Sequence, residues 1–591
     1  MPAWLIALSR WWLLRLVRIS VVPPAADAPA LDRGQVVFYA LQVRQFSAFL
    51  ALDEATRQLG LPRAAAPSAG DGLRERRSFF FLTRSGQPSP LRRAPYRYSH
   101  RLARAVAAVR ADPSLQVQIV PVSIFFGRAP RHQDSLIKAL LADAWTTPGA
   151  IQQFFRLLVH GRQTLVKFGP PMDLRKLLRA GAEDPEGQRD LRRVARLLRA
   201  EFRQERELAI GPNLSHRQTV VNEIIDSEPV QQAVRDEAQR TGASIERAEL
   251  GARRMAVEIA SDYSYPFIRA YDIALTALWN RLYDGVEVHR FETIASAGTG
   301  AEIVYLPCHR SHIDYLLLSY VIYHRGLLPP HIAAGVNLNL PIVGAMLRRG
   351  GAFFLRRSFK GEPLYAAVFA EYLHTILRRG FPIEYFVEGG RSRSGLTLPA
   401  KAGLLAMTVD SFLREPARPL VFVPVYIGYE QLIEAASYAA ELAGKPKQKE
   451  SLAGLIRGLL ALRKRSFGKV HVAIGEPIRL AELLDAQWPG WRDEARGEPD
   501  SAGRTRAISA LSTLVVTRIN EALVINPINL FATAMLGAPA PAMDAQRLAE
   551  QIDLMRSLLQ AIPYSPLQQV SSLNGAEVID YAAVQGLAVR Q

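Results

Sequence analysis

The sequence predicts an α/β protein in which a mixed-sheet domain is preceded by a degenerate copy of itself, with helical regions between and after the two copies. Two observations lead to this prediction. Runs of β-branched and aromatic residues alternate with stretches of helical periodicity, as in sheets covered by helices. Segments from the first third of the chain also recur in the same order beyond residue 300. At 591 residues, the chain is too long for a single hydrophobic core.

Four pairs of segments carry the repeat. Each pair is weak by itself, but chance does not readily place all four in the same order, so we interpret them as a tandem duplication. The pairs are VVFYALQVRQFSAFL (from Val36) with EIVYLPCHRSHIDYLL (from Glu302), FFFLTRSG (from Phe79) with EYFVEGGR (from Glu384), QIVPVSIFFG (from Gln118) with VFVPVYIGYE (from Val421), and LVKFGPPMDLRKLL (from Leu165) with VHVAIGEPIRLAELL (from Val470).

The two copies differ in their ionisable residues. Val43 and Ala48 stand where the second copy has His309 and Asp314, and Thr83 stands where it has Glu388. A copy that keeps its strand and turn residues but loses these groups has kept its packing and lost its chemistry. We therefore expect activity in the second copy.

The expected organisation follows from these segments. In the second copy, apolar runs predict strands at 303–306, 352–355, 383–387, 420–427 and 470–474, and helices are predicted at 315–325, 364–379 and 401–413. The expected regions are an interfacial amphipathic helix (1–22), the degenerate domain (31–185), a helical region (186–295), the second domain (296–490) and a helical C-terminal region (500–591).

The segment 4–22, WLIALSRWWLLRLVRISVV, is the most apolar part of the N-terminus. Arg10, Arg15 and Arg18 interrupt it, so it is not the run of about 20 apolar residues that a spanning helix needs. On a helical wheel the arginines share one arc, and tryptophans are plentiful, which favours a helix lying in the membrane interface. A core helix or the start of a signal peptide are the alternatives.

The charge balance indicates anionic partners. With 73 Lys+Arg against 55 Asp+Glu, the formal net charge is +18. Lipid headgroups, an acidic carrier protein, a phosphate substrate or nucleic acid would all suit such a surface. We expect no nucleic-acid binding, because no recognisable binding motif accompanies the charge. The single cysteine, Cys308, excludes an intrachain disulfide.

His309 and Asp314 form an H-x-x-x-x-D motif directly after a predicted strand. A positioned imidazole can take a proton from an alcohol, and a nearby carboxylate can fix its tautomer. This is the relay of a serine hydrolase without its serine, so the substrate's own hydroxyl would be the nucleophile. A role for Asp314 at a helix start is the alternative. Cys308 as a covalent nucleophile is disfavoured, because only His309 is at hand to activate it.

Two further strand ends carry arginines. Arg356 and Arg357 follow GAFFL, and Arg391 and Arg393 follow the glycine turn after Glu388. Arginine binds phosphate oxygens in bidentate geometry, and glycines permit a close backbone approach. The set therefore indicates a site for a phosphate monoester, although any single arginine can instead pair with a carboxylate of the protein.

The four blocks HRSHID, GAFFLRR, FVEGGRSRSG and FVPVYIGYE, in this order, resemble those of the glycerolipid acyltransferases. The flanking segments DYLLLSYVIYHRGLLPPHIAAGVNLN and SFKGEPLY resemble the bacterial membrane-bound glycerol-3-phosphate 1-O-acyltransferases of the PlsB type. The strong resemblance covers residues 302–484. Members of that family usually continue through a further large, mostly helical region, so the C-terminal region is expected to be shorter than theirs.

The resemblance implies transfer of a fatty acyl group from acyl-CoA or acyl-acyl carrier protein to the sn-1 hydroxyl of glycerol 3-phosphate, which gives lysophosphatidate and begins phospholipid synthesis. It implies His309 as general base and Asp314 as its partner, without a cofactor. No Cys, His and Asp cluster has metal-ligand spacing, so the residues themselves predict no metal site. The resemblance also implies a peripheral or monotopic location on the cytoplasmic face of the inner membrane, against anionic lipids. The implied glycerol 3-phosphate site is Arg356, Arg357, Glu388, Gly389, Arg391, Ser392 and Arg393, and the implied acyl-chain groove contains Pro424 and Val425.

Two alternatives stay open from the residues alone. Arginines recognise the phosphate and not the rest of the acceptor, so dihydroxyacetone phosphate or lysophosphatidate would fit the same site. The chain would also suit a non-catalytic membrane scaffold, since its first copy has already lost its ionisable groups.

Overall fold

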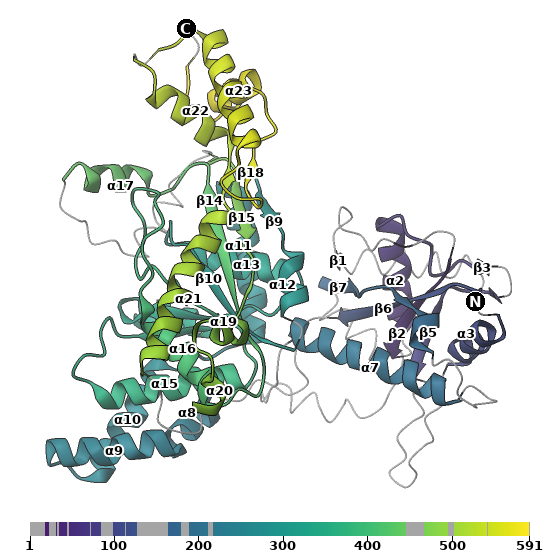
Figure 1. Cartoon of the computed structure of the whole chain (residues 1–591), viewed down its shortest axis with the longest axis horizontal. Helices are drawn as coiled ribbons and strands as arrows, with labels where there is room; N and C mark the ends of the chain where they lie inside the picture. Colours follow the sequence, from purple (N-terminus) through teal and green to yellow (C-terminus); the bar gives the residue numbers. More distant parts are fainter. Residues whose placement is uncertain are drawn as a thin grey trace. The chain divides into compact units, whose positions relative to one another are not determined.

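The computed structural model describes residues 18–22, 31, 35–43, 46–70, 73–83, 99–112, 114–126, 163–178, 188–210, 217–298, 300–444, 466–494, 501–539 and 542–589. The chain divides into two compact units, the first made of Met1–Asn213 with His324–Leu328 and the second of Leu214–Tyr323 with Pro329–Gln591. One large mixed sheet forms the centre of each unit (Figure 1).

The sheet of the first unit has the strand order β1-β7-β6-β2-β5. The central strand β2 runs parallel to β5 and β6, whereas β7 is antiparallel to β6 and parallel to β1. The short β8 also pairs with β6, and β3 and β4 form a separate hairpin. The strands are β1 (Arg18–Val22), β2 (Val36–Val43), β3 (Ser68–Gly70), β4 (Leu73–Glu75), β5 (Phe79–Thr83), β6 (Val117–Phe126), β7 (Gln163–Phe168) and β8 (Met172–Asp173).

Helices cover both faces of this sheet. α2 (Phe46–Gln58) packs on the face that carries Tyr39. α3 (His100–Ala111), α6 (Leu174–Leu177) and α7 (Gln188–Ile210) pack on the face that carries Phe38. Successive residues of a strand point to opposite faces, so burial on both faces requires the continuous apolar runs seen in the sequence.

The expected interfacial helix is wrong over its last five residues, because Arg18–Val22 form β1 at the edge of this sheet. The β-branched residues Ile19, Val21 and Val22 suit a strand better than a helix. The rest of that expected helix, residues 1–17, lies outside the described residues. None of the described helices has both the length and the apolar character needed to cross a membrane.

The sheet of the second unit has the order β12-β11-β13-β10-β14-β15-β9. Here β10 is parallel to β13 and β14, and β15 is antiparallel to β14 but parallel to β9. A parallel extension through β11 and β12 completes the sheet, and β16 pairs with β14. The strands are β9 (Val286–His289), β10 (Glu302–Pro307), β11 (His331–Gly335), β12 (Ala352–Leu355), β13 (Ile383–Glu384), β14 (Leu420–Tyr429), β15 (Val470–Ile474) and β16 (Ile478–Arg479).

A continuous layer of helices packs in the second unit. α15 contacts α8, α9, α10 and α16, and α21 contacts α16, α19 and β14. The helices are α8 (Arg217–Asp226), α9 (Glu228–Thr241), α10 (Ile245–Ile259), α11 (Tyr265–Leu282), α12 (Glu292–Ala297), α13 (Asp314–His324), η3 (Val336–Leu338), α14 (Pro341–Arg349), α15 (Pro363–Arg378), α16 (Ala402–Arg414), α17 (Ala435–Leu442), α19 (Leu480–Gln487), α20 (Trp491–Glu494) and α21 (Ser501–Glu521). Beyond them, α22 (Pro527–Leu536), α23 (Ala545–Ala561) and α24 (Gly575–Val584) share a separate small core.

Each of the six strands of the first sheet has a counterpart in the second sheet, which contains β11 and β12 in addition. In order and direction, β1, β7, β6, β2, β5 and β8 correspond to β9, β15, β14, β10, β13 and β16. The registers agree as well: Tyr39 lies opposite Phe79 as Tyr305 lies opposite Glu384, and Pro121 has the place that Pro424 has in the second sheet. This agreement supports the duplication and its alignment.

Several expected elements differ from the observed ones. β9 and β11 were not predicted, because VEVH and HIAAG lack a long β-branched run. β13 ends at Glu384, since the chain then turns into a glycine loop. The expected helical region 186–295 does not form one domain but is divided between the two units. Its first helix, α7, packs on the first sheet, whereas α8 to α11 belong to the second unit and β9 joins the second sheet. The C-terminal region contains one small strand pair, β17 (Val524–Ile525) and β18 (Gln569–Val570).

Candidate active site

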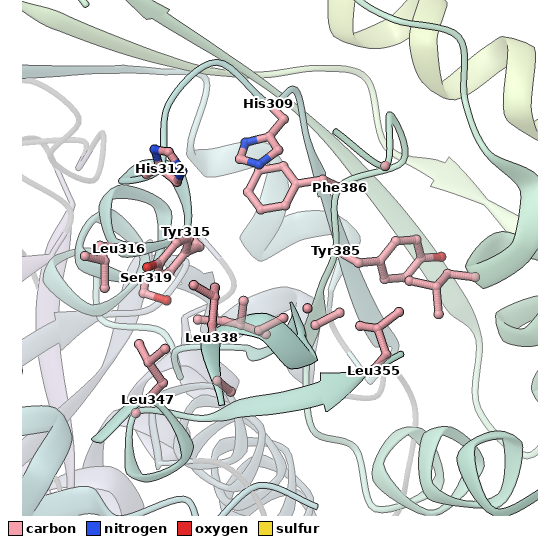
Figure 2. A pocket seen from close by; sticks show the side chains of 18 of the residues that line it. His309, His312, Tyr315, Leu316, Ser319, Leu338, Leu347, Leu355, Tyr385 and Phe386 are labelled. Carbon is pink, nitrogen blue, oxygen red and sulfur yellow. The ribbon is translucent and has the colours of Figure 1, made fainter. Parts of the chain in front are cut away.

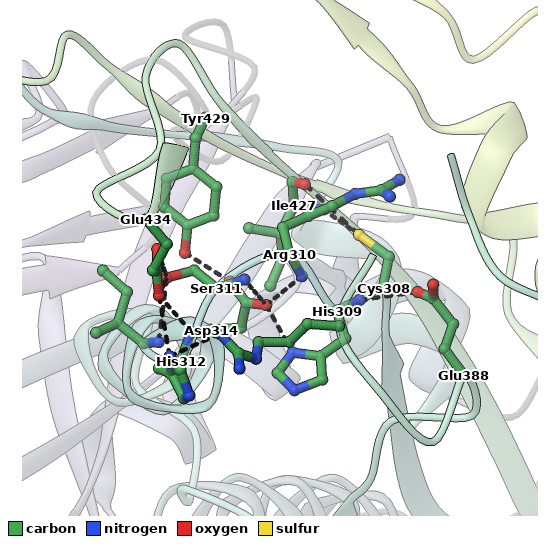
Figure 3. A network of polar contacts seen from close by, with 12 residues as sticks. Cys308, His309, Arg310, Ser311, His312, Asp314, Glu388, Ile427, Tyr429 and Glu434 are labelled. Carbon is green, nitrogen blue, oxygen red and sulfur yellow. Dashed lines mark hydrogen bonds and ion pairs between the residues drawn. The ribbon is translucent and has the colours of Figure 1, made fainter. Parts of the chain in front are cut away.

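Asp314 is the centre of a polar network at the end of β10 (Figure 3). Its Oδ2 atom accepts hydrogen bonds from the backbone amides of Arg310 (2.6 Å) and Ser311 (2.8 Å) and lies 3.0 Å from His309 Nδ1. Its Oδ1 atom accepts a bond from the Tyr429 hydroxyl at 2.7 Å. The carboxylate is completely buried, so these four groups replace the water it would otherwise bind.

The His309 ring is held from two sides. Nδ1 faces Asp314, and the ring stacks on Phe386 with 3.9 Å between centroids (Figure 2). Nε2 forms no hydrogen bond with the described residues, and His309 lines a cavity. With Nδ1–H donating to Asp314, Nε2 is free to accept a proton from a hydroxyl in that cavity.

Glu388 holds the two loops of the site together. Its Oε1 atom accepts a hydrogen bond from the His309 amide at 2.8 Å, and Oε2 accepts one from the Leu398 amide at 2.7 Å. The side chain is only 2% exposed. Its carboxylate therefore positions the backbone of His309 and does not reach into the cavity.

The glycine turn after Glu388 brings a second backbone bond to His309. Gly389 has a φ of 62°, and a Cβ atom there would lie 2.6 Å from the Lys401 side chain, so only glycine fits. Beyond the turn, the amide of Ser392 donates to the His309 carbonyl at 2.9 Å. Ser392 is buried and lies behind the catalytic loop.

The cavity has a volume of about 850 Å³ and is lined by side chains of two chemical kinds. Apolar side chains come from α11, α13, η3, α14, β12 and α16. The lining also contains the basic residues Arg356, Arg357, Arg391, Arg393 and Lys401. The apolar lining includes Ile268, Leu275, Leu316, Leu338, Leu347, Leu355, Leu404 and Met407.

The basic residues differ in whether they already form ion pairs with carboxylates of the protein. Arg357 is exposed and forms no hydrogen bond or ion pair with the described residues. Arg356 instead donates to Glu258 at 2.8 and 2.9 Å and pairs with Glu362. Arg393 pairs with Glu441. Of the four arginines, Arg357 is therefore the one best placed to bind an anion.

A second carboxylate network supports Arg391. Glu434 accepts bonds from the hydroxyl of Ser311 (2.9 Å) and the amide of His312 (3.0 Å). Arg391 in turn contacts the His312 ring at 2.8 Å and donates to the Tyr438 hydroxyl at 2.7 Å. Burial of Glu434 opposes ionisation, but its hydrogen bonds with His312 and Ser311 outweigh that effect and lower its pKa.

The structure places His309, Arg357, Gly389 and Arg391 in the lining of one cavity, and Asp314 contacts His309 from behind. Pro424 and Val425, the expected acyl-groove residues, do not line it: they lie within β14, where Val425 is fully buried. The lining residues that the sequence did not predict are Lys401 and the apolar residues of α11, α13, η3, α14, β12 and α16.

Three polar residues of the network were also missed. Tyr429 is separated from Asp314 by 115 positions, and Glu434 from Ser311 by 123. Tyr429 is the second-to-last residue of the block FVPVYIGYE, which is the only signal that marked it. Glu384 was noticed only as a possible arginine partner, yet it is fully buried and its oxygens form no hydrogen bond with the described residues. Burial and the nearby charge of Asp314 raise its pKa well above the usual range.

Cys308 is fully buried beside His309, and its sulfur contacts the backbone of Ile427. Burial raises the pKa of its thiol to about 11. A thiol in such a place is a poor nucleophile. The small side chain fills the space between β10 and β14.

Three protein families match successive parts of the chain. The family described as glycerol-3-phosphate acyltransferase PlsB N-terminal domain matches residues 5–211. The family described as acyltransferase matches residues 285–428, and the glycerol-3-phosphate acyltransferase C-terminal region matches residues 438–590. His309, Asp314 and Glu388 lie in the middle match.

Similar curated proteins bear the name glycerol-3-phosphate acyltransferase. One from Ectopseudomonas mendocina is 45% identical over 577 residues, which is 97% of this chain and 69% of that protein. One from Pseudomonas syringae pv. tomato is 44% identical over 579 residues, 97% of this chain and 68% of that protein. The crystal structure of the 1-acyl-sn-glycerophosphate (LPA) acyltransferase PlsC from Thermotoga maritima matches 42% of this chain and 77% of that chain, with 18% identity and a TM-score of 0.24.

The burial of Cys308 predicts slow chemical labelling of the native thiol. A pKa that is higher by about two units leaves roughly a hundredfold less thiolate at neutral pH, and burial slows access further. We expect N-ethylmaleimide to modify the native chain at least about a hundredfold more slowly than the chain in urea, measured by mass spectrometry. Equal rates would contradict the placement of this cysteine, which is the only one in the sequence.

Proposed function

The chain belongs to the family of glycerol-3-phosphate acyltransferases, and from this premise we propose that it transfers a fatty acyl group from a thioester donor to the sn-1 hydroxyl of glycerol 3-phosphate. The donor would be acyl-CoA or acyl-acyl carrier protein, and the product lysophosphatidate. The observation that carries the proposal is the His309–Asp314 pair at a largely apolar cavity whose lining also contains basic residues.

The phosphate of the acceptor would bind at Arg357, with Arg391 and Lys401 in the lining of the same cavity. Each charge-assisted hydrogen bond contributes about 1.5–3 kcal/mol. Two of them would hold a phosphate firmly enough to place the neighbouring glycerol hydroxyl beside His309. Arg356, Glu388 and Ser392 would support these groups from behind.

The reaction then needs one proton transfer in each direction. His309 Nε2 takes the proton of the sn-1 hydroxyl, and the oxygen attacks the thioester carbonyl carbon. As the tetrahedral intermediate collapses, the carbon–sulfur bond breaks, and His309 returns the proton to the leaving thiolate. Asp314 holds Nδ1–H throughout and stabilises the imidazolium between the two steps.

The backbone amides near His309 narrow the choice of oxyanion donor. The amide of His309 is used by Glu388, and those of Arg310 and Ser311 are used by Asp314. The amide of Gly390 forms no hydrogen bond with the described residues, and Gly390 lines the cavity. We assign the oxyanion to this amide, a type of contact whose loss typically costs a hundred- to a thousandfold in rate.

The apolar lining of the cavity would hold the acyl chain, and its surroundings suit a membrane surface. On α14, Leu347 lines the cavity while Ile342 and Met346 are 76% and 44% exposed. Arg349 on the same helix is also exposed. Both the donor and the product are amphiphiles, so an exposed apolar edge beside the cavity supports a peripheral location on an anionic membrane, where lipids would cover these side chains.

The proposal predicts that His309→Ala abolishes acyl transfer without unfolding the protein. General-base catalysis contributes roughly a hundred- to ten-thousandfold, so turnover should fall at least a hundredfold. The measurement is release of the donor thiol from palmitoyl-CoA, with and without glycerol 3-phosphate, in detergent or lipid vesicles. His324→Ala, which changes an exposed histidine in the last turn of α13, is the control and should keep its activity.

Two other functions are tested in the same assay. Faster thiol release with dihydroxyacetone phosphate or lysophosphatidate than with glycerol 3-phosphate would contradict the acceptor. Absence of release from folded wild-type protein with either kind of donor would contradict catalysis and favour the scaffold.

The adjacent arginines predict two different phenotypes. Arg357→Ala should raise the KM for glycerol 3-phosphate roughly ten- to a hundredfold with little change in kcat, because it loses a charge-assisted bond to the substrate. Arg356→Ala should chiefly lower the unfolding temperature, because Glu258 and Glu362 lose their partner. Steady-state kinetics and thermal unfolding of both variants decide this, and an unchanged KM for Arg357→Ala would remove that residue from the site.

Glu388 predicts a positioning phenotype. In Glu388→Gln, one carboxylate oxygen is replaced by the NH2 group of a carboxamide, which cannot accept the hydrogen bond from the backbone amide it faces, so the His309 loop shifts. We expect kcat to fall at least tenfold while the KM for glycerol 3-phosphate changes little. A KM rise with kcat preserved would instead show that the carboxylate contacts the substrate.

A further inference from the structure

A group of metal-ligating side chains lies on two neighbouring strands, outside the cavity described above. Glu287 and His289 belong to β9, and His471 belongs to β15 (Figure 1). In the parallel register, His471 lies beside Glu287, while His289 lies beside Ala473, two residues further along. Residues two apart on a strand point to the same face, and one ligand atom of each of the three residues lies within 4.8 Å of the others.

The imidazole nitrogens of this group lack the partners that buried polar atoms normally have. His471 is 5% exposed, and neither of its ring nitrogens forms a hydrogen bond with the described residues. The Nε2 atom of His289 is buried and unpartnered in the same way. Buried polar groups are seldom left unsatisfied, so two such rings side by side require an explanation.

The carboxylates around His471 are arranged as in a metal site. Its Nδ1 atom lies 3.4 Å from Glu287 Oε2, and its Nε2 atom lies 3.9 Å from Glu430 Oε1. Metal-binding histidines usually present one nitrogen to the ion and the other to a carboxylate. Glu430 is itself fixed by the Lys469 amide and the Tyr581 hydroxyl, both at 2.7 Å.

We propose that Glu287, His289 and His471 bind one transition-metal ion of the Zn²⁺ class. Two imidazoles and one carboxylate suit zinc better than calcium or magnesium, which prefer oxygen ligands. Lys469 bonds Glu287 at Oε1 and leaves Oε2 for the ion. Small side-chain rotations would bring the three ligand atoms to about 2.0–2.1 Å from it.

The ion would act on the fold and not on the acyl transfer itself. β9 is the edge strand of the second sheet, and the ion would link it to β15. The ligand on β15, His471, lies more than 180 positions along the sequence from the two ligands on β9. None of the three ligands lines the cavity. In the sequence only the short pattern Glu287-x-His289 is visible, and this pattern alone does not predict a metal site. The third ligand, His471, is brought beside it by the pairing of β15 with β9.

Zinc titration of untagged, full-length protein tests the proposal. The protein is stripped with EDTA, freed of the chelator, and titrated with Zn²⁺ against a competing dye, with metal content measured by mass spectrometry. We expect about one tightly bound ion per chain in the wild type and in the control His100→Gln, an exposed histidine of the first unit. His289→Gln and His471→Asn should lose it, and Glu430→Gln should bind roughly 10- to 100-fold more weakly.

Two results would overturn the proposal. Absence of tight zinc binding by the wild type would show that His471 lies between Glu287 and Glu430 without an ion. Equal zinc content in wild type, His289→Gln and His471→Asn would place the ion elsewhere. If His471→Asn does not fold, the zinc content of His289→Gln decides, because the His289 side chain is only partly buried. X-ray absorption at the zinc edge of the zinc-loaded wild type should then show nitrogen and oxygen ligands.

Discussion

The active site depends on one buried carboxylate. Asp314 is completely buried, and it is tolerated there because two backbone amides, a tyrosine hydroxyl and the His309 ring replace its water. The two amides belong to the loop that carries His309, so the same charge orients the imidazole and fixes the backbone on which it is mounted. Removal of the carboxylate would therefore free the loop as well as lose the catalytic partner.

Glu388 holds the His309 loop from the other side. Asp314 fixes the C-terminal side of His309, and Glu388 fixes its amide, across 79 positions of the chain. Because the other Glu388 oxygen holds the Leu398 amide, the loop with the glycine turn and the loop with the base form one rigid body. Arg391, on that turn, is thereby set at a defined place relative to His309. Catalysis between a bound phosphate and a base requires this kind of fixed distance.

The sequence predicted the residues of the site better than their roles. His309, Arg357 and Glu388 each follow a recognisable apolar strand, and the carboxyl ends of parallel strands meet at one edge of a sheet. The roles of Glu388 and Ser392 were not predictable, because they bond to backbone groups, and backbone groups leave no trace in a side-chain pattern. Distant partners such as Tyr429 depend on strand register. β1 was mistaken for helix because the arginine spacing suits a wheel, whereas its β-branched residues and its pairing with β7 favour a strand.

The comparison of the two sheets shows why fold and chemistry can be lost separately. Strand order and register are the same in both, although Val43, Ala48 and Thr83 replace His309, Asp314 and Glu388. The register is set by apolar residues on both faces of the strands, such as Phe38 and Tyr39, which pack on opposite helices. The site residues lie beyond the strand ends and contribute little to that packing. A duplicated domain can therefore keep its sheet after its buried carboxylates are gone, and its loops are then free of the geometric demand that Asp314 and Glu388 impose on the second copy.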